Sequence, residues 1–103
     1  MPSDRLPLVT PGEILLEEFL KPLGLSQNRL GRDLNVPAQR ISQIIRGRRA
    51  ISTDTALRLS AYFGTTPQFW LNLQNEYDLR LAAETRHTEQ VRREVRRLEQ
   101  SAA

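Results

Sequence analysis

The sequence predicts an all-α fold of five or six helices in a chain of 103 residues. Apolar residues recur at three- and four-residue spacing through most of the chain, which is the period of an amphipathic helix. Residues able to cap a helix precede these runs, and glycine or proline follows several of them. The only strand-like run, residues 6–10, is short and weak. A chain of this length is expected to form one domain with a single core.

The first helix is predicted to begin after Thr10. Thr10 can cap the helix, Pro11 suits its first position, and Glu13 completes a capping box. Pro22 and Gly24 are expected to end the helix. The apolar stripe that should face the core consists of Ile14, Leu15, Phe19 and Leu20.

Residues 26–47 have the spacing of a helix-turn-helix. Ser26 caps a helix with Gly31 in its middle, Asn35 is the expected left-handed turn residue, and Pro37 begins the next helix. The alternative is a plain helical hairpin, but a mid-helix glycine costs about 1 kcal/mol relative to alanine. That alternative leaves Gly31 unexplained, whereas a motif with closely crossing helices requires a small residue there. The residues expected to anchor the turn and the following helix in the core are Val36, Ile41, Ile44 and Ile45, with Gly47 as the stop.

The positive charge of the chain is concentrated in this same segment. Residues 26–50 carry six arginines and Asp33, a net charge of +5, whereas residues 1–25 have a net charge of −2. Residues 51–75 and 76–103 are each balanced. A concentrated basic patch indicates a partner with a phosphate backbone. We therefore expect double-stranded DNA, with the helix after the turn in the major groove.

The outward face of that helix carries side chains suited to reading bases. Glutamine can pair with adenine and arginine with guanine through two hydrogen bonds each, and an alanine methyl can touch a thymine methyl. Gln39, Arg40 and Gln43 are the predicted base readers, and the arginines that follow are predicted phosphate clamps, with a solvated loop as the alternative. The N-terminus of the helix before the turn can offer backbone N–H groups to a phosphate. The complete predicted DNA-binding set is Gln27, Ala38, Gln39, Arg40, Ser42, Gln43, Arg46, Arg48 and Arg49.

Two further helices are predicted after this segment. Ser52 or Thr53 caps the first of them, Gly64 ends it, and Thr66 caps the second. Aromatic residues in the second could form a platform for nucleic-acid bases, but at helical spacing we expect them in the core. The expected inward residues are Ala56, Leu57, Leu59, Tyr62 and Phe63 in the first helix, and Phe69, Trp70, Leu73, Tyr77 and Leu81 in the second.

The chain is expected to divide into an N-terminal arm (1–9), a DNA-binding domain (10–83) and a charged C-terminal helix or tail (84–103). Val91, Val95 and Leu98 form a thin apolar seam in the last part. The seam is interpreted either as an element that binds a partner or a second copy, or as part of a frayed tail.

Catalysis and cofactors are not expected. The chain has no cysteine, which excludes disulfides and thiolate metal sites, and its single histidine, His87, lies in a charged segment. No paired-carboxylate or nucleophile motif is present, so no enzyme, metal or cofactor is predicted. No apolar run approaches the roughly 20 residues of a membrane span, and no signal peptide opens the chain. A cytoplasmic protein without a membrane partner is expected.

Several segments resemble HigA-type antitoxins, over residues 10–82 in all. They are residues 11–19 (Pro-Gly-Glu-Ile-Leu-Leu-Glu-Glu-Phe), the helix-turn-helix ending in 44–49 (Ile-Ile-Arg-Gly-Arg-Arg), 51–59, 66–74 and 77–80. The opening Pro-Gly-Glu and the Phe-Trp-Leu-Asn-Leu-Gln run of residues 69–74 are the most specific parts. The resemblance implies a phage-repressor-like helix-turn-helix of the xenobiotic-response-element class, and it carries the DNA-binding roles of that motif onto Gln27, Gln39, Arg40 and Gln43.

The resemblance also implies a function. Such antitoxins of type II toxin–antitoxin systems neutralise a HigB-type mRNA-cleaving ribonuclease and repress their own operon by binding its operator as homodimers. The acidic face made by Glu13, Glu17 and Glu18 is a candidate surface for a basic toxin, with an ordinary solvated helix face as the alternative. The rival functions are a stand-alone transcriptional repressor of the same fold and a structural helical bundle.

Overall fold

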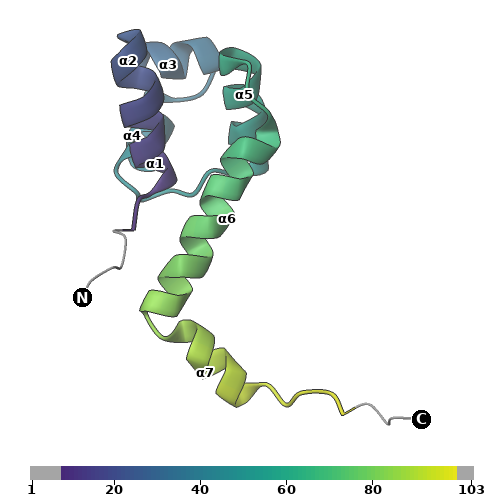
Figure 1. The fold of residues 1–103 in the computed structure, drawn as a ribbon. Coiled ribbons are helices and arrows are strands. Elements are labelled where there is room, and N and C mark those ends of the chain that lie inside the picture. The colour runs from purple at the N-terminus through teal and green to yellow at the C-terminus, as the bar shows by residue number, and fades with distance from the viewer. Residues whose placement is uncertain (1–7, 100–103) are drawn as a thin grey trace.

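The computed structural model describes residues 8–99, which form six helical segments and no strand (Figure 1). The prediction of an all-α fold with five or six helices is confirmed. Residues 1–7 of the predicted N-terminal arm, and with them part of the strand-like run, lie outside the described residues; residues 8–10 have no regular secondary structure. The segments are α1 (Pro11–Ile14), η1 (Leu15–Leu20) and α2 (Lys21–Leu23) in one continuous helix, then α3 (Gln27–Leu34), α4 (Ala38–Ile45), α5 (Thr53–Phe63), α6 (Pro67–Glu84) and α7 (His87–Glu94).

The helix starts lie where the capping residues predicted them. The Thr10 hydroxyl accepts from the Glu13 N–H at 3.1 Å, and a Glu13 carboxylate oxygen accepts from the Thr10 N–H at 3.3 Å. The hydroxyls of Ser26, Ser52 and Thr66 each accept from the N–H three residues later. These bonds satisfy backbone donors that the first helical turn leaves without a partner.

The turn between α3 and α4 is the predicted left-handed one. Asn35 has φ of 60°, and its N–H and that of Val36 donate to carbonyl groups near the end of α3. The helix α4 begins at Ala38, one residue later than predicted, because Pro37 has an extended ψ of 141° and is the N-cap of the helix.

The middle of the first helical segment is wider than an α-helix. Residues Leu15–Leu20 form a π-helix, which apolar periodicity did not predict. This segment contributes buried Leu15 and Leu20 to the core, and Phe19 reaches α5 and α6, where its ring lies 4.9 Å from those of both Phe63 and Trp70.

One apolar core joins the first helical segment to the helices α3, α4, α5 and α6. Trp70 is fully buried and its indole N–H donates to the Thr65 hydroxyl at 2.7 Å, so burial leaves no polar group without a partner. The same holds for every other buried side-chain nitrogen or oxygen among the described residues. The buried apolar residues are Leu15, Leu20, Leu30, Leu34, Ile41, Ile44, Ile51, Ala56, Leu59 and Trp70.

Three residues predicted to face the core are exposed instead. Leu57 is 53% exposed because α5 buries Ala56, Leu59 and Ser60, and a helix turning by about 100° per residue places Leu57 to one side of that face. Phe69 and Leu81 are 37% and 38% exposed. The Phe69 ring lies 4.9 Å from that of Trp70, and Leu81 lies eleven residues after Trp70, near the C-terminal end of α6.

The C-terminal segment, predicted as a charged helix or tail, is helical only in its first part. α7 ends at Glu94, and residues 95–99 are not helical. Val91, Val95 and Leu98 of the apolar seam are all exposed. Figure 1 shows the reason, since α7 lies beyond the end of α6 and away from α3, α4 and α5.

Two glycines allow helices to approach α4 closely. A Cβ atom on Gly12 would overlap the carbonyl oxygen of Ile44 and lie 2.8 Å from the Ile45 Cα, so α1 rests directly on the backbone of α4. A Cβ on Gly31 would lie 3.1 Å from the Ala38 Cα, which is the close crossing that the sequence predicted for the helix-turn-helix. The role of Gly12 was not predicted.

Replacing Gly12 with alanine is therefore expected to lower the free energy of unfolding by roughly 1–3 kcal/mol, because overlap with backbone forces α1 away from α4. On an open helix surface the same change would instead stabilise by up to about 1 kcal/mol. Urea denaturation of Gly12→Ala measures the effect. Gly31→Ala serves as the comparison and should lose less stability, because a Cβ on Gly31 would come no closer than 3.1 Å to the nearest atom, the Ala38 Cα. A Gly12→Ala protein as stable as the original would show that α1 does not rest on α4.

Candidate nucleic-acid interface

The recognition helix α4 divides into an inward and an outward face. Ile41 and Ile44 are fully buried, whereas Ala38 and Gln39 are exposed and Arg40, Ser42 and Gln43 are half-buried. The predicted residues thus share one face, which the buried isoleucines hold outward. Gln27 is half-buried in the first turn of α3, next to the cap Ser26.

The arginines after α4 stand on a short loop that is fixed at its far end. Arg46, Arg48 and Arg49 are exposed. The next anchor is Ile51, whose side chain is 3% exposed and whose N–H donates to the buried Gln74 side-chain oxygen at 2.8 Å. Gln74 thereby ties the arginine loop to α6, a role that no sequence pattern marked.

Two of the predicted DNA-binding residues bind each other. The Arg49 Nε donates to the Gln43 side-chain oxygen at 2.9 Å. With Pro37, Gln39 and Arg40 they line a shallow hollow on the outer surface of α4. The structure therefore brings a predicted base reader and a predicted phosphate clamp into contact.

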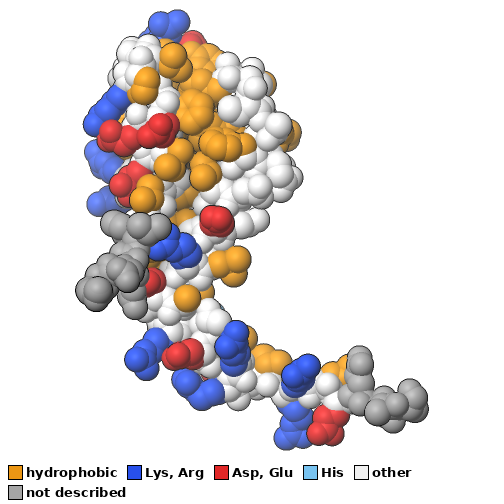
Figure 2. Space-filling model, in the orientation of Figure 1, with side chains coloured by type: hydrophobic (Ala, Val, Ile, Leu, Met, Phe, Trp, Pro, Cys, Tyr) orange, Lys and Arg blue, Asp and Glu red, His pale blue; other side chains and the backbone are white. Residues whose placement is uncertain are grey.

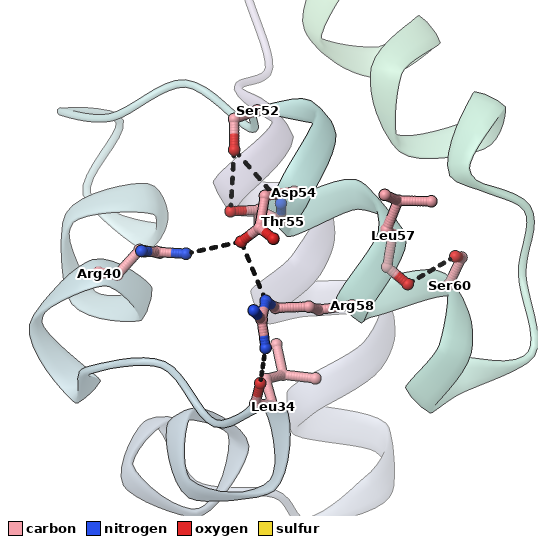
Figure 3. A network of polar contacts seen from close by, with 8 residues as sticks. All are labelled: Leu34, Arg40, Ser52, Asp54, Thr55, Leu57, Arg58 and Ser60. Atoms are coloured by element: carbon pink, nitrogen blue, oxygen red, sulfur yellow. Dashed lines mark hydrogen bonds and ion pairs between the residues drawn. The ribbon is translucent and has the colours of Figure 1, made fainter.

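Arg40 is connected to α5 and, through it, to α3 (Figure 3). Its guanidinium donates to one oxygen of the Asp54 carboxylate at 3.1 Å, and the Arg58 Nε donates to that same oxygen at 2.9 Å. Arg58 also donates to the carbonyl oxygen of Leu34 at 2.9 Å, which satisfies an acceptor at the C-terminal end of α3. Asp54 and Arg58 were not among the predicted site residues, because they lie 14 and 18 positions away from Arg40 in the chain.

Both acidic groups beside the helix-turn-helix are held ionised. The hydrogen bond from Arg58 is the main cause that lowers the pKa of Asp54; partial burial opposes it, and Arg40 adds to the lowering. The Tyr62 hydroxyl, 2.6 Å from the Asp33 carboxylate, is the main cause that lowers the pKa of Asp33. The same bond raises the pKa of Tyr62.

The acidic residues of the first helical segment are exposed, as predicted, but two of them have partners. Glu13 is engaged in the capping box, and Glu17 forms an ion pair with Lys21 at 2.8 Å. Glu18 follows Glu17 on the same exposed surface. Figure 2 shows acidic side chains on the side of the molecule formed by the first helical segment, beside a band of apolar side chains.

Within residues 8–99, no cluster of histidine and acidic side chains has the arrangement of a metal site. No helix in this range combines the length and the apolar character that crossing a membrane requires.

Comparison with known proteins places the helix-turn-helix in a family. A helix-turn-helix family model matches residues 16–70. The virulence-associated protein I of Dichelobacter nodosus is 48% identical over 86 residues, which cover 84% of this chain and 80% of that protein. The Pseudomonas aeruginosa antitoxin HigA, solved with the higBA promoter, is 42% identical with a TM-score of 0.81 over 90% of this chain and all of that one. The chain belongs to the HigA-type helix-turn-helix family. The antitoxin GraA, solved in complex with its operator, is 43% identical with a TM-score of 0.82 over 97% of this chain and all of that one.

All nine predicted DNA-binding residues of this HigA-type chain lie inside the matched segment, and so do Asp54 and Arg58. The acidic face is only partly inside it, because Glu17 and Glu18 lie within the matched segment and Glu13 lies before it. The predicted resemblance to HigA-type proteins is confirmed.

The Asp33–Tyr62 bond of this HigA-type fold should make stability depend on pH at both ends of the range. The pKa of Asp33 is lower in the folded chain, so its contribution is complete above the unfolded pKa of about 4 and is lost as pH falls through the folded pKa. The pKa of Tyr62 is raised, so its contribution is lost as pH rises through the folded pKa, above about 10.

Urea denaturation of the original chain and Asp33→Asn from pH 7 down to pH 3 tests the acidic side. The difference in unfolding free energy should stay constant down to about pH 4 and then shrink. Tyr62→Phe, which removes only the hydroxyl donor, is the matched control and should show the same shrinkage. A difference that does not change with pH would mean that the bond does not hold Asp33 ionised.

Proposed function

We propose that this chain is an operator-binding antitoxin that represses its own operon and neutralises a HigB-type mRNA-cleaving ribonuclease. The observation that carries the DNA-binding half is the outward face of α4, where glutamine and arginine side chains stand beside an exposed arginine loop. Similar chains solved with promoter or operator DNA support this assignment.

In this proposal the outward face of α4 enters the major groove. Gln39, Arg40 and Gln43 read base edges, Ala38 and Ser42 contact the same groove, and the arginine loop holds phosphates. The N-terminus of α3, with Gln27 in its first turn, meets a phosphate of the neighbouring backbone. Arg46, Arg48 and Arg49 are the phosphate clamps, since they are exposed and follow the recognition helix directly.

A homodimer places two recognition helices on one operator, about one DNA turn or roughly 34–36 Å apart. Exposed apolar side chains on α6 and α7 support a two-fold contact between copies there. Leu79 is 71% exposed and Val91 is 41% exposed, and burial of such groups is favourable when a second copy covers them.

The toxin surface is proposed on the first helical segment. Glu17 and Glu18 are exposed on it, and Leu23, 60% exposed, and the half-buried Phe19 provide apolar area on the same segment. An acidic rim next to apolar side chains complements a basic protein. None of these residues belongs to α4 or to the arginine loop, so the proposal assigns DNA and toxin to different residues of one copy.

The DNA-binding roles predict two different defects. Gln43→Ala should reduce the preference at one base pair by roughly 1–3 kcal/mol, because a base reader discriminates sequence. Arg48→Ala should weaken specific and random duplexes alike and lower the salt dependence by about one phosphate contact. Titration of the DNA directly upstream of the coding sequence, at several salt concentrations, measures both and counts the protomers bound to each duplex.

Equal losses on specific and random DNA for Gln43→Ala would remove Gln43 from the base readers. Binding that is independent of both sequence and salt would contradict the repressor proposal altogether, and a single protomer on a specific site would contradict the dimer.

The toxin-binding half is tested by co-expression with the product of the adjacent reading frame, tagging only that product. The proposal expects this chain to elute with it and to restore growth. Glu17→Lys combined with Glu18→Lys should weaken the complex by charge repulsion and leave operator binding unchanged, because neither residue is among the proposed DNA-binding residues. Glu89→Lys with Glu94→Lys on α7 makes the same change of net charge elsewhere and is the control.

Absence of a complex, with sequence-specific DNA binding intact, would favour a stand-alone repressor. A complex that tolerates the reversal at Glu17 and Glu18 would place the toxin surface elsewhere on the chain.

A further inference from the structure

We propose that Asp54 is a positioning residue for base recognition, which holds the Arg40 guanidinium in the orientation that reads one base pair. The inference rests on the proposed operator binding and adds to it a residue outside the helix-turn-helix. Asp54 lies on α5, near its N-terminus.

The Asp54 carboxylate is held in place by a contact other than the one it makes with Arg40. Arg58 lies four residues after Asp54 on α5 and donates to its carboxylate at 2.9 Å, while a second N–H of Arg58 donates to the Leu34 carbonyl at 2.9 Å. The carboxylate is therefore anchored to both α5 and the end of α3. Arg40, approaching from α4, meets an acceptor whose place is already set (Figure 3).

Arg40 is less mobile than a surface arginine as a result. Its side chain is 28% exposed, whereas that of Arg58 is 39% exposed and that of Arg86, just before α7, is 84% exposed. A free arginine has many rotamers, and the conformational entropy lost when it is ordered upon binding lowers both affinity and selectivity. An arginine already held at the protein surface loses less freedom when it binds a base.

The contact leaves most of the guanidinium available. Only Nη1 of Arg40 donates to Asp54, so the remaining N–H groups can still form the planar pair of bonds that guanine accepts. Arg40 is the third residue of α4, and the N-terminal residues of a recognition helix are those that contact base edges. In this arrangement Asp54 holds the Arg40 guanidinium from the protein side. The remaining N–H groups of Arg40 face the major groove.

Charge gives Asp54 a second effect. It is the single acidic residue in residues 51–75, and it stands among the arginines of the basic face. The low pKa of its carboxyl keeps it ionised throughout the physiological range. A negative charge beside the phosphates weakens binding to every sequence, so the residue lowers non-specific affinity while it raises discrimination.

A role limited to stability would look different. If Asp54 served only to join α4 to α5, its loss would loosen the whole recognition helix and weaken every base contact together. If it acts through Arg40, its loss affects the base pair that Arg40 reads, and no other.

The experiment uses the full chain and a duplex selected by the original protein from a random-sequence pool. Affinities for all single-base variants of that duplex are measured for Asp54→Asn, Arg40→Ala and the double variant. The expected result for Asp54→Asn is a loss of roughly tenfold in preference at the base pair where Arg40→Ala also loses preference. Binding to random duplex should be unchanged or tighter, and the double variant should lose no more preference than Arg40→Ala alone.

Two further variants serve as controls. Glu18→Gln makes the same change of net charge on the first helical segment, outside α4 and α5, and should leave every base preference intact. Asp54→Glu restores the carboxylate and should recover part of the lost preference, which also keeps the test decisive if Asp54→Asn folds poorly.

The proposal is overturned if Asp54→Asn keeps its preference at every base pair, if it loses preference uniformly, or if its effect adds in full to that of Arg40→Ala. An original chain that selects no sequence would instead contradict the proposed function itself, so the two failures are distinguishable.

Discussion

The structure depends on how the inward face of α4 rests on the rest of the molecule. Ile41 and Ile44 are fully buried, and the backbone of α1 lies against that of α4 because Gly12 has no side chain. Direct contact between backbones leaves no room for the adjustment that interleaved side chains permit. The outward face of α4 is therefore presented at one fixed angle, which is what an element entering the major groove requires.

Polar side chains from α5 and α6 bind backbone groups that the apolar core does not bind, at the end of α3 and at the end of the arginine loop. Arg58 binds the carbonyl of Leu34 at the end of α3, and Gln74 binds the N–H of Ile51 at the end of the arginine loop. Arg58 joins α5, and Gln74 joins α6, to a backbone group that would otherwise form its hydrogen bond with water. The helix-turn-helix is thus held at the turn side by α5 and at the loop side by α6. Neither Arg58 nor Gln74 is among the proposed DNA-binding residues, yet both help to set where those side chains stand.

The sequence predicted the interactions between residues close together in the chain and missed those between distant residues. The caps at Thr10, Ser26 and Thr66 and the turn at Asn35 act over three or four residues, so their residue types mark them directly. The core was predicted where periodicity was strong, and the prediction failed at Leu57, which lies beyond the edge of the face that α5 buries through Ala56 and Leu59. The Arg40–Asp54, Arg58–Leu34 and Ile51–Gln74 contacts span 14 to 24 residues. Their partners are ordinary polar residues of helices, and only the packed fold brings them together.

The outward positions of α4 consequently differ in how independently they can change. Gln39 is exposed and makes no side-chain hydrogen bond within the part of the chain that the structure describes, so its replacement disturbs only what it contacts on the partner. Arg40 and Gln43 are each joined to another side chain, Asp54 and Arg49 respectively. Replacing Arg40 leaves the Asp54 charge balanced by Arg58 alone, and replacing Gln43 releases the Arg49 side chain from its partner. Substitutions at Arg40 and Gln43 are therefore expected to be coupled to their partners, whereas a substitution at Gln39 acts alone, because two of the proposed base readers are held in pairs of side chains and the third is not.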